Sequence, residues 1–303
     1  MKILVVTFDH NYYLWQSLVQ INNFIKYGYD QDIIYLIASS NPSPVLKAMM
    51  NSDKIKAKFY IYKDERINSK YPSSLRPFLL EKLFTDYPEL EKEVIFYIDP
   101  DVVFTKKLDF TDMINDDYWH VSDTRGYLDS KYIKNTSDKL FNEMCDIVGI
   151  SPEVIINNDS NAGGAQYLMK GLNANYWKKV YKDSEELYSH MKNTENLYQK
   201  KIQIWTADMW SVFWNAIYFG YKVKINRKLN FCWAPWSKNM WDETYIFHNA
   251  GIFDNNTTDF CKIHYQNSPF YQELKVDEKN CTFNYVKEIK ETENNFQDII
   301  RFF

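Results

Sequence analysis

The chain has 303 residues, enough for one large domain or two small ones, and 45% of them are apolar. Aromatic residues make up 17% of the chain, which excludes a disordered protein and indicates a packed body. The formal net charge is −4 and no long basic run occurs, so we expect no nucleic-acid partner.

Short apolar runs alternate with stretches of helical spacing over the N-terminal third. Gly28 is a suitable stop for the first expected helix, and Pro77 suits the first position of the third. Strands that alternate with helices predict an α/β fold in which a mostly parallel central sheet is flanked by helices. In chain order we expect strand 3–8, helix 14–27, strand 32–38, helix 45–50, strand 57–62, helix 77–84 and strand 94–98.

The rest of the chain is less regular. Trp, Asn and Tyr accumulate from residue 226 onward with little periodicity, which indicates an irregular, aromatic-rich C-terminal part folded over a cleft. No repeat or low-complexity linker divides the chain, so we expect one domain over residues 1–270 and a tail at 271–303 that packs on it or extends it. Further elements are expected as strand 118–121, helix 139–148, strand 165–169, helix 174–193, helix 207–219 and strand 221–225.

The cysteines and the N-terminus indicate the compartment. Cys145, Cys232, Cys261 and Cys281 match neither a zinc pattern nor a redox pair, which favours reduced thiols. The opening MKILVVTF is typical of a core strand rather than a signal peptide. No stretch approaches the roughly 18 apolar residues of a membrane span. We therefore expect a cytoplasmic protein without a transmembrane segment, and the oligomeric state stays open.

The segment VIFYIDPDVVF carries two carboxylates directly after a buried strand. Residues i and i+2 of an extended chain face the same side, so Asp99 and Asp101 can converge. Pro100 fits the carboxyl end of a strand, which is where open α/β sheets bind ligands. Two such charges repel unless a cation lies between them, and Mg²⁺ or Mn²⁺ suits carboxylates together with phosphate oxygens. The alternative is an ordinary Asp-Pro-Asp turn.

VIFYIDPDVVF resembles the Asp-x-Asp segment of GT-A-fold glycosyltransferases, which use nucleotide-diphosphate sugars. The resemblance extends over roughly residues 1–269. It implies a GT-A (Rossmann-like) domain, a nucleotide-sugar donor with UDP as the expected nucleotide, and Mn²⁺ or Mg²⁺ on Asp99 and Asp101. VVTFD resembles the first strand and loop that cradle the nucleotide, which implies that Thr7 and Asp9 lie by the base and ribose.

Two further segments resemble donor-binding elements of that fold. SSLRPFLLEKLF resembles the segment in which a basic residue approaches the nucleotide, which implies Arg76; its alternative is a solvated charge at a helix start. SNAGGAQYLMKG resembles the segment beneath the donor sugar. Gly163 and Gly164 would allow close backbone approach, while Asn161, a candidate catalytic residue, and Gln166 would bond hydroxyls. The alternative is a tight turn that enters a strand.

WTADMWSVFWNAI resembles the acidic helix start of the fold, which implies Asp208 as a catalytic residue or a ligand of sugar hydroxyls. A carboxylate that complements the helix dipole is the alternative. FHNAG and CKIHY resemble the His-x-x-Gly…Lys element of retaining family 8 enzymes. This implies His248 as the third metal ligand, with Gly251 and Lys262 at the diphosphate. The spacing between Gly251 and Lys262 departs from that family, so His264 remains a rival ligand.

These motifs together predict metal-dependent transfer of a sugar from a UDP-sugar to a hydroxyl of a glycan, peptide or lipid-linked acceptor. Retention follows from the His-x-x-Gly likeness, whereas an inverting enzyme would use Asp208 as the base. Trp233, Trp236 and Trp241 suit sugar stacking or, equally, an aromatic core.

Two other functions stay open. One is a sugar nucleotidyltransferase, although VVTFDHNYYLW lacks its glycine-rich basic loop. The other is a non-catalytic carbohydrate-binding module with a structural cation, although such modules are mostly all-β.

Overall fold

The computed structural model describes residues 1–67, 69–250, 252 and 258–303. These form two compact units. The acid-pair unit, which contains Asp99 and Asp101, comprises residues 2–63, 98–110 and 228–303. The glycine-pair unit, which contains Gly163 and Gly164, comprises Met1 and residues 64–97 and 111–227.

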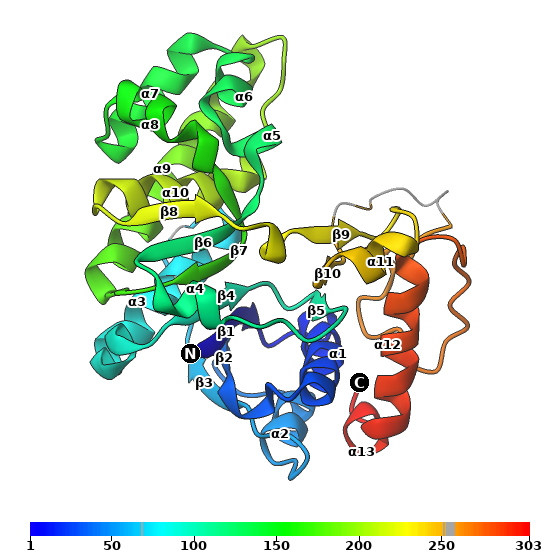
Figure 1. The fold of residues 1–303 in the computed structure, drawn as a ribbon. Helices are drawn as coiled ribbons and strands as arrows, with labels where there is room; N and C mark the ends of the chain where they lie inside the picture. The colour runs from blue at the N-terminus through cyan, green and yellow to red at the C-terminus, as the bar shows by residue number, and fades with distance from the viewer. Residues whose placement is uncertain (68, 251, 253–257) are drawn as a thin grey trace. The chain divides into compact units, whose positions relative to one another are not determined.

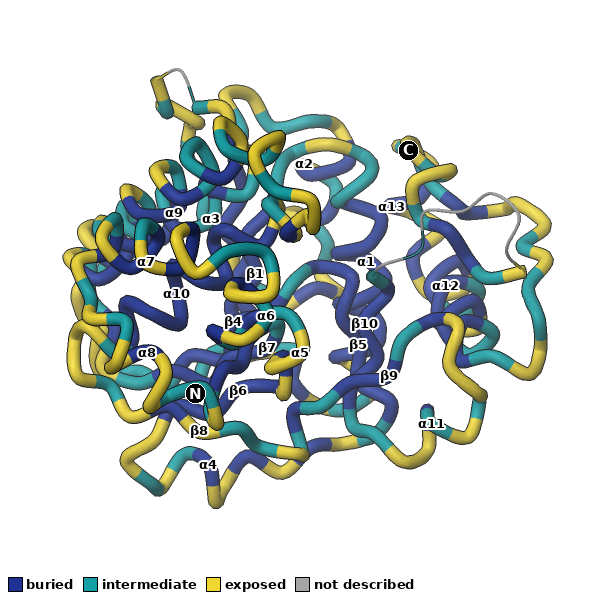
Figure 2. Tube along the Cα trace, turned by 90° about the horizontal axis from the view of Figure 1, so that it is seen from above, coloured by how far each residue is buried: buried dark blue, intermediate teal, exposed yellow. Residues whose placement is uncertain are grey.

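Three parallel strands in the order β3-β2-β1 form one sheet region of the acid-pair unit. Helix α1 packs on β1 and is buried along most of its length, as Figure 2 shows. It ends at Gly28, whose φ of 77° is the left-handed conformation that glycine adopts without strain. The elements are β1 (Lys2–Phe8), α1 (Asn11–Tyr27), β2 (Ile33–Ala38), α2 (Pro44–Met50) and β3 (Lys58–Tyr62).

A second, three-stranded sheet of the same unit joins distant parts of the chain. Its order is β5-β10-β9, with β5 (Val102–Phe104), β10 (Ile246–His248) and β9 (Phe231–Trp233). The antiparallel register pairs His248 with Val102, the residue after Asp101. This ladder therefore carries a late histidine to the acid pair.

Three helices lie in the C-terminal segment of the acid-pair unit. They are α11 (Asn239–Glu243), α12 (Thr282–Asn295) and α13 (Gln297–Ile300). Helix α12 lies beside α1 in Figure 1, and the buried Glu288 accepts hydrogen bonds from Asn23 and Lys26, each at 3.1 Å.

The glycine-pair unit contains strands in the order β4-β7-β6-β8. The β4–β7 and β6–β7 pairs are antiparallel, and β6–β8 is parallel. The strands are β4 (Ile95–Ile98), β6 (Tyr118–Asp123), β7 (Gly163–Met169) and β8 (Lys222–Ile225).

Helices pack over these strands around buried tryptophans. Helix α10 contacts β7 and β8, and α9 contacts both α3 and α10. Trp177 on α9 and Trp210 and Trp214 on α10 are fully buried. The helices are α3 (Leu75–Asp86), α4 (Thr111–Asn115), α5 (Arg125–Leu128), α6 (Ser130–Lys134), α7 (Asp138–Val148), α8 (Pro152–Asn158), α9 (Ala174–Thr194) and α10 (Ala207–Tyr218).

The predicted α/β class is confirmed, with mostly parallel strands flanked by helices, and each expected strand and helix is present within a few residues of its predicted ends. The aromatic-rich part after residue 226 is largely irregular as expected, but it also contains the short strands β9 and β10 and the helix α12. Helix α12 was missed because its buried face mixes Tyr285 and Ile289 with polar Glu288 and Thr292. The division of the chain at residue 270 stays a prediction. Among the described residues no helix has the length and apolarity to span a membrane.

The α1–α12 contact gives a stability prediction. Glu288→Ala removes a carboxylate that is 6% exposed and leaves Asn23 and Lys26 without it. We expect a loss of about 2 kcal/mol in the free energy of unfolding, measured by urea denaturation. Glu291→Ala is the matched control, since Glu291 pairs with the same lysine but is 41% exposed, and should cost under ~1 kcal/mol. Equal losses would contradict this account.

Candidate functional site

Two carboxylates and an imidazole meet in the acid-pair unit. Asp99, Asp101 and His248 each offer a ligand atom, and these atoms lie within 4.8 Å of one another. His248 Nε2 is 3.2 Å from Asp101 Oδ1 and 3.7 Å from Asp99 Oδ2. The predicted convergence of the acid pair is thus present, with a nitrogen ligand added.

Amide side chains of α1 fix the backbone of the acid pair. Gln20 Nε2 donates to the carbonyl oxygens of Asp99 and Val102, both at 2.8 Å. One turn later, Asn23 bonds both the N–H and the C=O of Phe104. Tyr35 in turn donates to Gln20 Oε1 at 2.7 Å. Buried amide side chains of α1 therefore hold the backbone on both sides of the Asp-Pro-Asp turn. These amides were not predicted from the sequence.

Asp101 is the buried member of the pair. It is 3% exposed, whereas the Asp99 side chain is 28% exposed. Lys262 Nζ forms an ion pair with Asp101 Oδ2. Burial alone would raise the pKa of Asp101, but the charges of Lys262 and His248 outweigh it and hold that pKa well below its usual range. The carboxylate is therefore ionised at neutral pH.

Aromatic rings fix the orientation of His248. Its ring stacks parallel to Trp233, with centroids 6.1 Å apart, and lies 5.3 Å from the Phe231 ring. Trp241 instead packs on Phe247 in the core, and Trp236 is 42% exposed. Of the three predicted tryptophans, Trp233 thus stacks on His248 of the acid-pair unit.

The other late residues have different positions. His264 is exposed at the end of a short 3₁₀ turn (Lys262–His264), outside the group of three ligands found among the described residues. Geometry therefore favours His248 over His264. Gly251 lies outside the described residues.

The first strand ends in a polar loop. Thr7 is buried in β1. Asp9 Oδ2 accepts hydrogen bonds from Ser39 Oγ at 2.7 Å and from the Ser43 N–H at 2.8 Å, which ties the end of β1 to the start of α2. Asp9 thus has structural partners, and the nucleotide contacts expected of Thr7 and Asp9 stay predictions.

Arg76 and Asp208 meet in the glycine-pair unit. Arg76, on α3, pairs with Asp208 Oδ2 in the first turn of α10. Tyr71 donates to Asp208 Oδ1 at 2.6 Å and accepts from the Asp208 N–H at 3.1 Å. Burial, then the charge of Asp208, raises the pKa of Tyr71 well above its usual value, so its phenol stays protonated. Tyr71 carried no motif and was missed.

The two glycines lie where β7 packs on its neighbours. A Cβ on Gly163 would lie 2.3 Å from Val121 Cγ2 and 2.5 Å from the Ser122 carbonyl oxygen. A Cβ on Gly164 would lie 2.6 Å from the hydroxyl of Tyr167. Close packing within this unit therefore accounts for both glycines without a ligand.

Two polar residues flank the glycines. Gln166 is fully buried and accepts from Ser122 Oγ at 2.6 Å, which links β7 to β6. Asn161 is half-buried at the end of a 3₁₀ turn (Asp159–Asn161) ahead of β7. The sugar contacts expected of both stay predictions.

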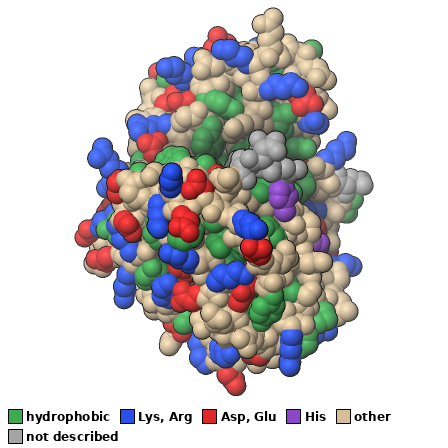
Figure 3. Space-filling model, turned by 90° about the vertical axis from the view of Figure 1, so that its right-hand side faces the viewer, with side chains coloured by type: hydrophobic (Ala, Val, Ile, Leu, Met, Phe, Trp, Pro, Cys, Tyr) green, Lys and Arg blue, Asp and Glu red, His purple; other side chains and the backbone are tan. Residues whose placement is uncertain are grey.

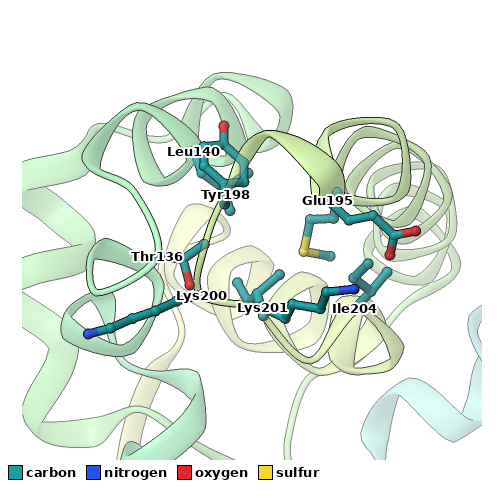
Figure 4. A pocket seen from close by; sticks show the side chains of 9 residues that line it. Thr136, Leu140, Glu195, Tyr198, Lys200, Lys201 and Ile204 are labelled. Atoms are coloured by element: carbon teal, nitrogen blue, oxygen red, sulfur yellow. The ribbon is translucent and has the colours of Figure 1, made fainter.

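Two hollows in the glycine-pair unit contain none of the predicted site residues. The first lies between α7, α9 and the segment before α10, where Lys200 and Lys201 line it (Figure 4). The second is lined by Asp116, Trp119 and residues at the start of β8. On the face shown in Figure 3, acidic and basic side chains are interspersed.

No family model matches the chain, and neither does any curated protein. Among solved structures, the galactosyltransferase LgtC in complex with donor and acceptor sugar analogues is 10% identical, at a TM-score of 0.48, over 97% of this chain and 96% of that chain. The glycosyltransferase GlyE of Streptococcus pneumoniae TIGR4 is 9% identical, at a TM-score of 0.46, over 99% of this chain and 64% of GlyE. At these values the function has to be argued from the residues of the site.

The glycine pair gives a direct test of close packing. Gly163→Ala should lower the free energy of unfolding by about 2 kcal/mol, because the new methyl meets a backbone oxygen that cannot easily move. Gly126→Ala is the control, since a Cβ there has nothing within 4 Å, and it should be neutral or slightly stabilising. The measurement is thermal unfolding of both variants and the wild type. A Gly163→Ala variant as stable as the wild type would contradict the close packing at this glycine.

Proposed function

We propose that this protein is a glycosyltransferase that uses a divalent cation to move a sugar from a nucleoside-diphosphate donor, with UDP as the expected nucleotide, to a hydroxyl acceptor. The observation that carries the proposal is the cluster of Asp99, Asp101 and His248. Such a cluster, at the end of a strand in an α/β protein, suits an ion that handles a diphosphate.

The donor set fits Mn²⁺ better than Mg²⁺, which prefers oxygen ligands. Two carboxylates and one imidazole suit Mn²⁺, which accepts both oxygen and nitrogen ligands. The imidazole argues against a structural Ca²⁺, which prefers oxygen ligands alone, and so against a carbohydrate-binding module. When bound, the cation would supply positive charge to the diphosphate as it becomes the leaving group.

The chain's own residues supply the remaining charge and orientation. Lys262, 22% exposed beside Asp101, would give a second positive charge to the departing diphosphate. The tight turn held by Gln20 fixes the direction of both carboxylates. Thr7, Asp9, Asn161, Gly163, Gly164, Gln166 and Gly251 remain the expected contacts of the donor.

Asp208 is a poor candidate for the base of an inverting reaction. Its Oδ1 accepts from Tyr71 and its Oδ2 is paired with Arg76. Neither oxygen is ready to take a proton from an acceptor hydroxyl. This supports a retaining outcome, in which the leaving phosphate takes that proton. It also gives Arg76 the role of neutralising the charge of Asp208 rather than that of a phosphate.

The reaction is tested by measuring UDP release from a panel of UDP-sugars with Mn²⁺. We expect one donor to be turned over, with loss of activity on chelation. Asp101→Asn should lower turnover by roughly 10²-fold or more, because it removes the buried charge that holds the cation. Asp298→Asn is the control and should leave turnover unchanged. Asp298 lies on α13, is exposed and pairs with Lys54.

Two results would contradict the proposal. One is turnover that survives Asp101→Asn or removal of the metal. The other is saturable sugar binding without UDP release from any donor, which would favour a binding module.

A further inference from the structure

We propose that Lys262 and the divalent cation compete for the Asp101 carboxylate, so that the cation binds tightly only when an anionic diphosphate draws Lys262 away. Lys262 would thereby couple metal binding to donor binding. The donor half of this coupling rests on the proposed function, because the anion invoked is the diphosphate of the donor.

Both oxygens of Asp101 are already engaged. Oδ2 is paired with Lys262 Nζ, and Oδ1 lies 3.2 Å from His248 Nε2. Asp99 is the other carboxylate of the ligand group. A cation that uses all three ligands therefore has to share Asp101 with the ammonium or displace it.

The balance of charge favours displacement only when an anion is present. Asp99 and Asp101 together carry two negative charges and Lys262 one positive charge, so these three side chains leave one negative charge in excess. A divalent cation would reverse that sign and place two positive centres on one carboxylate that is 3% exposed. Like charges in such a buried setting repel strongly. A diphosphate adds the negative charge that both cations need.

The positions of these residues suit such an exchange. Asp101 directly precedes β5 and His248 ends β10, so the ladder between the two strands holds both ligands in place. Lys262 instead begins a single 3₁₀ turn, outside that ladder. Its four-carbon stem lets the ammonium swing toward a nearby phosphate while the carboxylate stays still.

Coupling of this kind is reciprocal, so UDP should tighten Mn²⁺ binding by the same factor by which Mn²⁺ tightens UDP binding. For the wild type we expect roughly a 5- to 100-fold gain in Mn²⁺ affinity on saturation with UDP. Lys262→Met, which keeps the stem and removes the charge, should bind Mn²⁺ alone about 5-fold or more tightly than the wild type, with most of the gain from UDP lost.

The test is calorimetric titration of Mn²⁺ into the protein, alone and with UDP or inorganic pyrophosphate. Lys290→Met is the matched control, since this lysine pairs with Glu293 on α12 and should leave Mn²⁺ affinity unchanged. Asp101→Asn, with its fold checked by thermal unfolding, should abolish the binding and so assigns the titrated ion to this site.

Unchanged or weaker Mn²⁺ binding by Lys262→Met would overturn the competition. Wild-type Mn²⁺ affinity that is insensitive to both UDP and pyrophosphate would overturn the coupling. Coupled binding without transfer from any UDP-sugar would contradict the proposed reaction but support the coupling. Failure of the reaction can therefore be distinguished from failure of the coupling.

Discussion

The ion pair between Asp101 and Lys262 is the interaction on which the structure of the acid-pair unit depends. A carboxylate that is 3% exposed is unfavourable unless cationic groups and hydrogen bonds replace the water it has lost. The Lys262 ammonium pairs with Oδ2, His248 Nε2 lies 3.2 Å from Oδ1, and the Asn249 N–H donates to the Asp101 backbone carbonyl at 3.1 Å. Segments remote in sequence are thereby brought to one point.

Rigidity and mobility are divided between these partners. The amide of Gln20 on α1 bonds the backbone carbonyls of Asp99 and Val102, which flank the acid pair. The imidazole of His248 stacks on the ring of Trp233. The lysine comes from a short turn and carries the most adaptable side chain of the group. Because the two carboxylates are fixed and the lysine ammonium can move, the site can accept ligands of different charge without a change in its backbone.

Local pattern in the sequence was enough to predict the acid pair, because an apolar run that leads into Asp-Pro-Asp fixes both position and direction. The resemblance of FHNAG to a His-x-x-Gly element indicated His248, but the choice between it and His264 required the β5–β10 register. Gln20 and Tyr71 were unpredictable, since a buried polar side chain looks like a solvated one until its partner is known. The glycine pair was predicted as a ligand cradle, whereas the structure supplies a packing reason for it.

The antiparallel β5–β10 ladder also decides which changes of chain length the acid-pair unit could accommodate. Successive side chains of a strand point to opposite faces, so one residue inserted within Ile246–His248 would turn the imidazole away from Asp101. Residues added to the connection between β9 and β10 would leave that alternation intact, at an entropic cost that grows only slowly with length. The position of His248 beside Asp101 therefore depends on the alternation of side chains within β10 and not on the length of the connection before it.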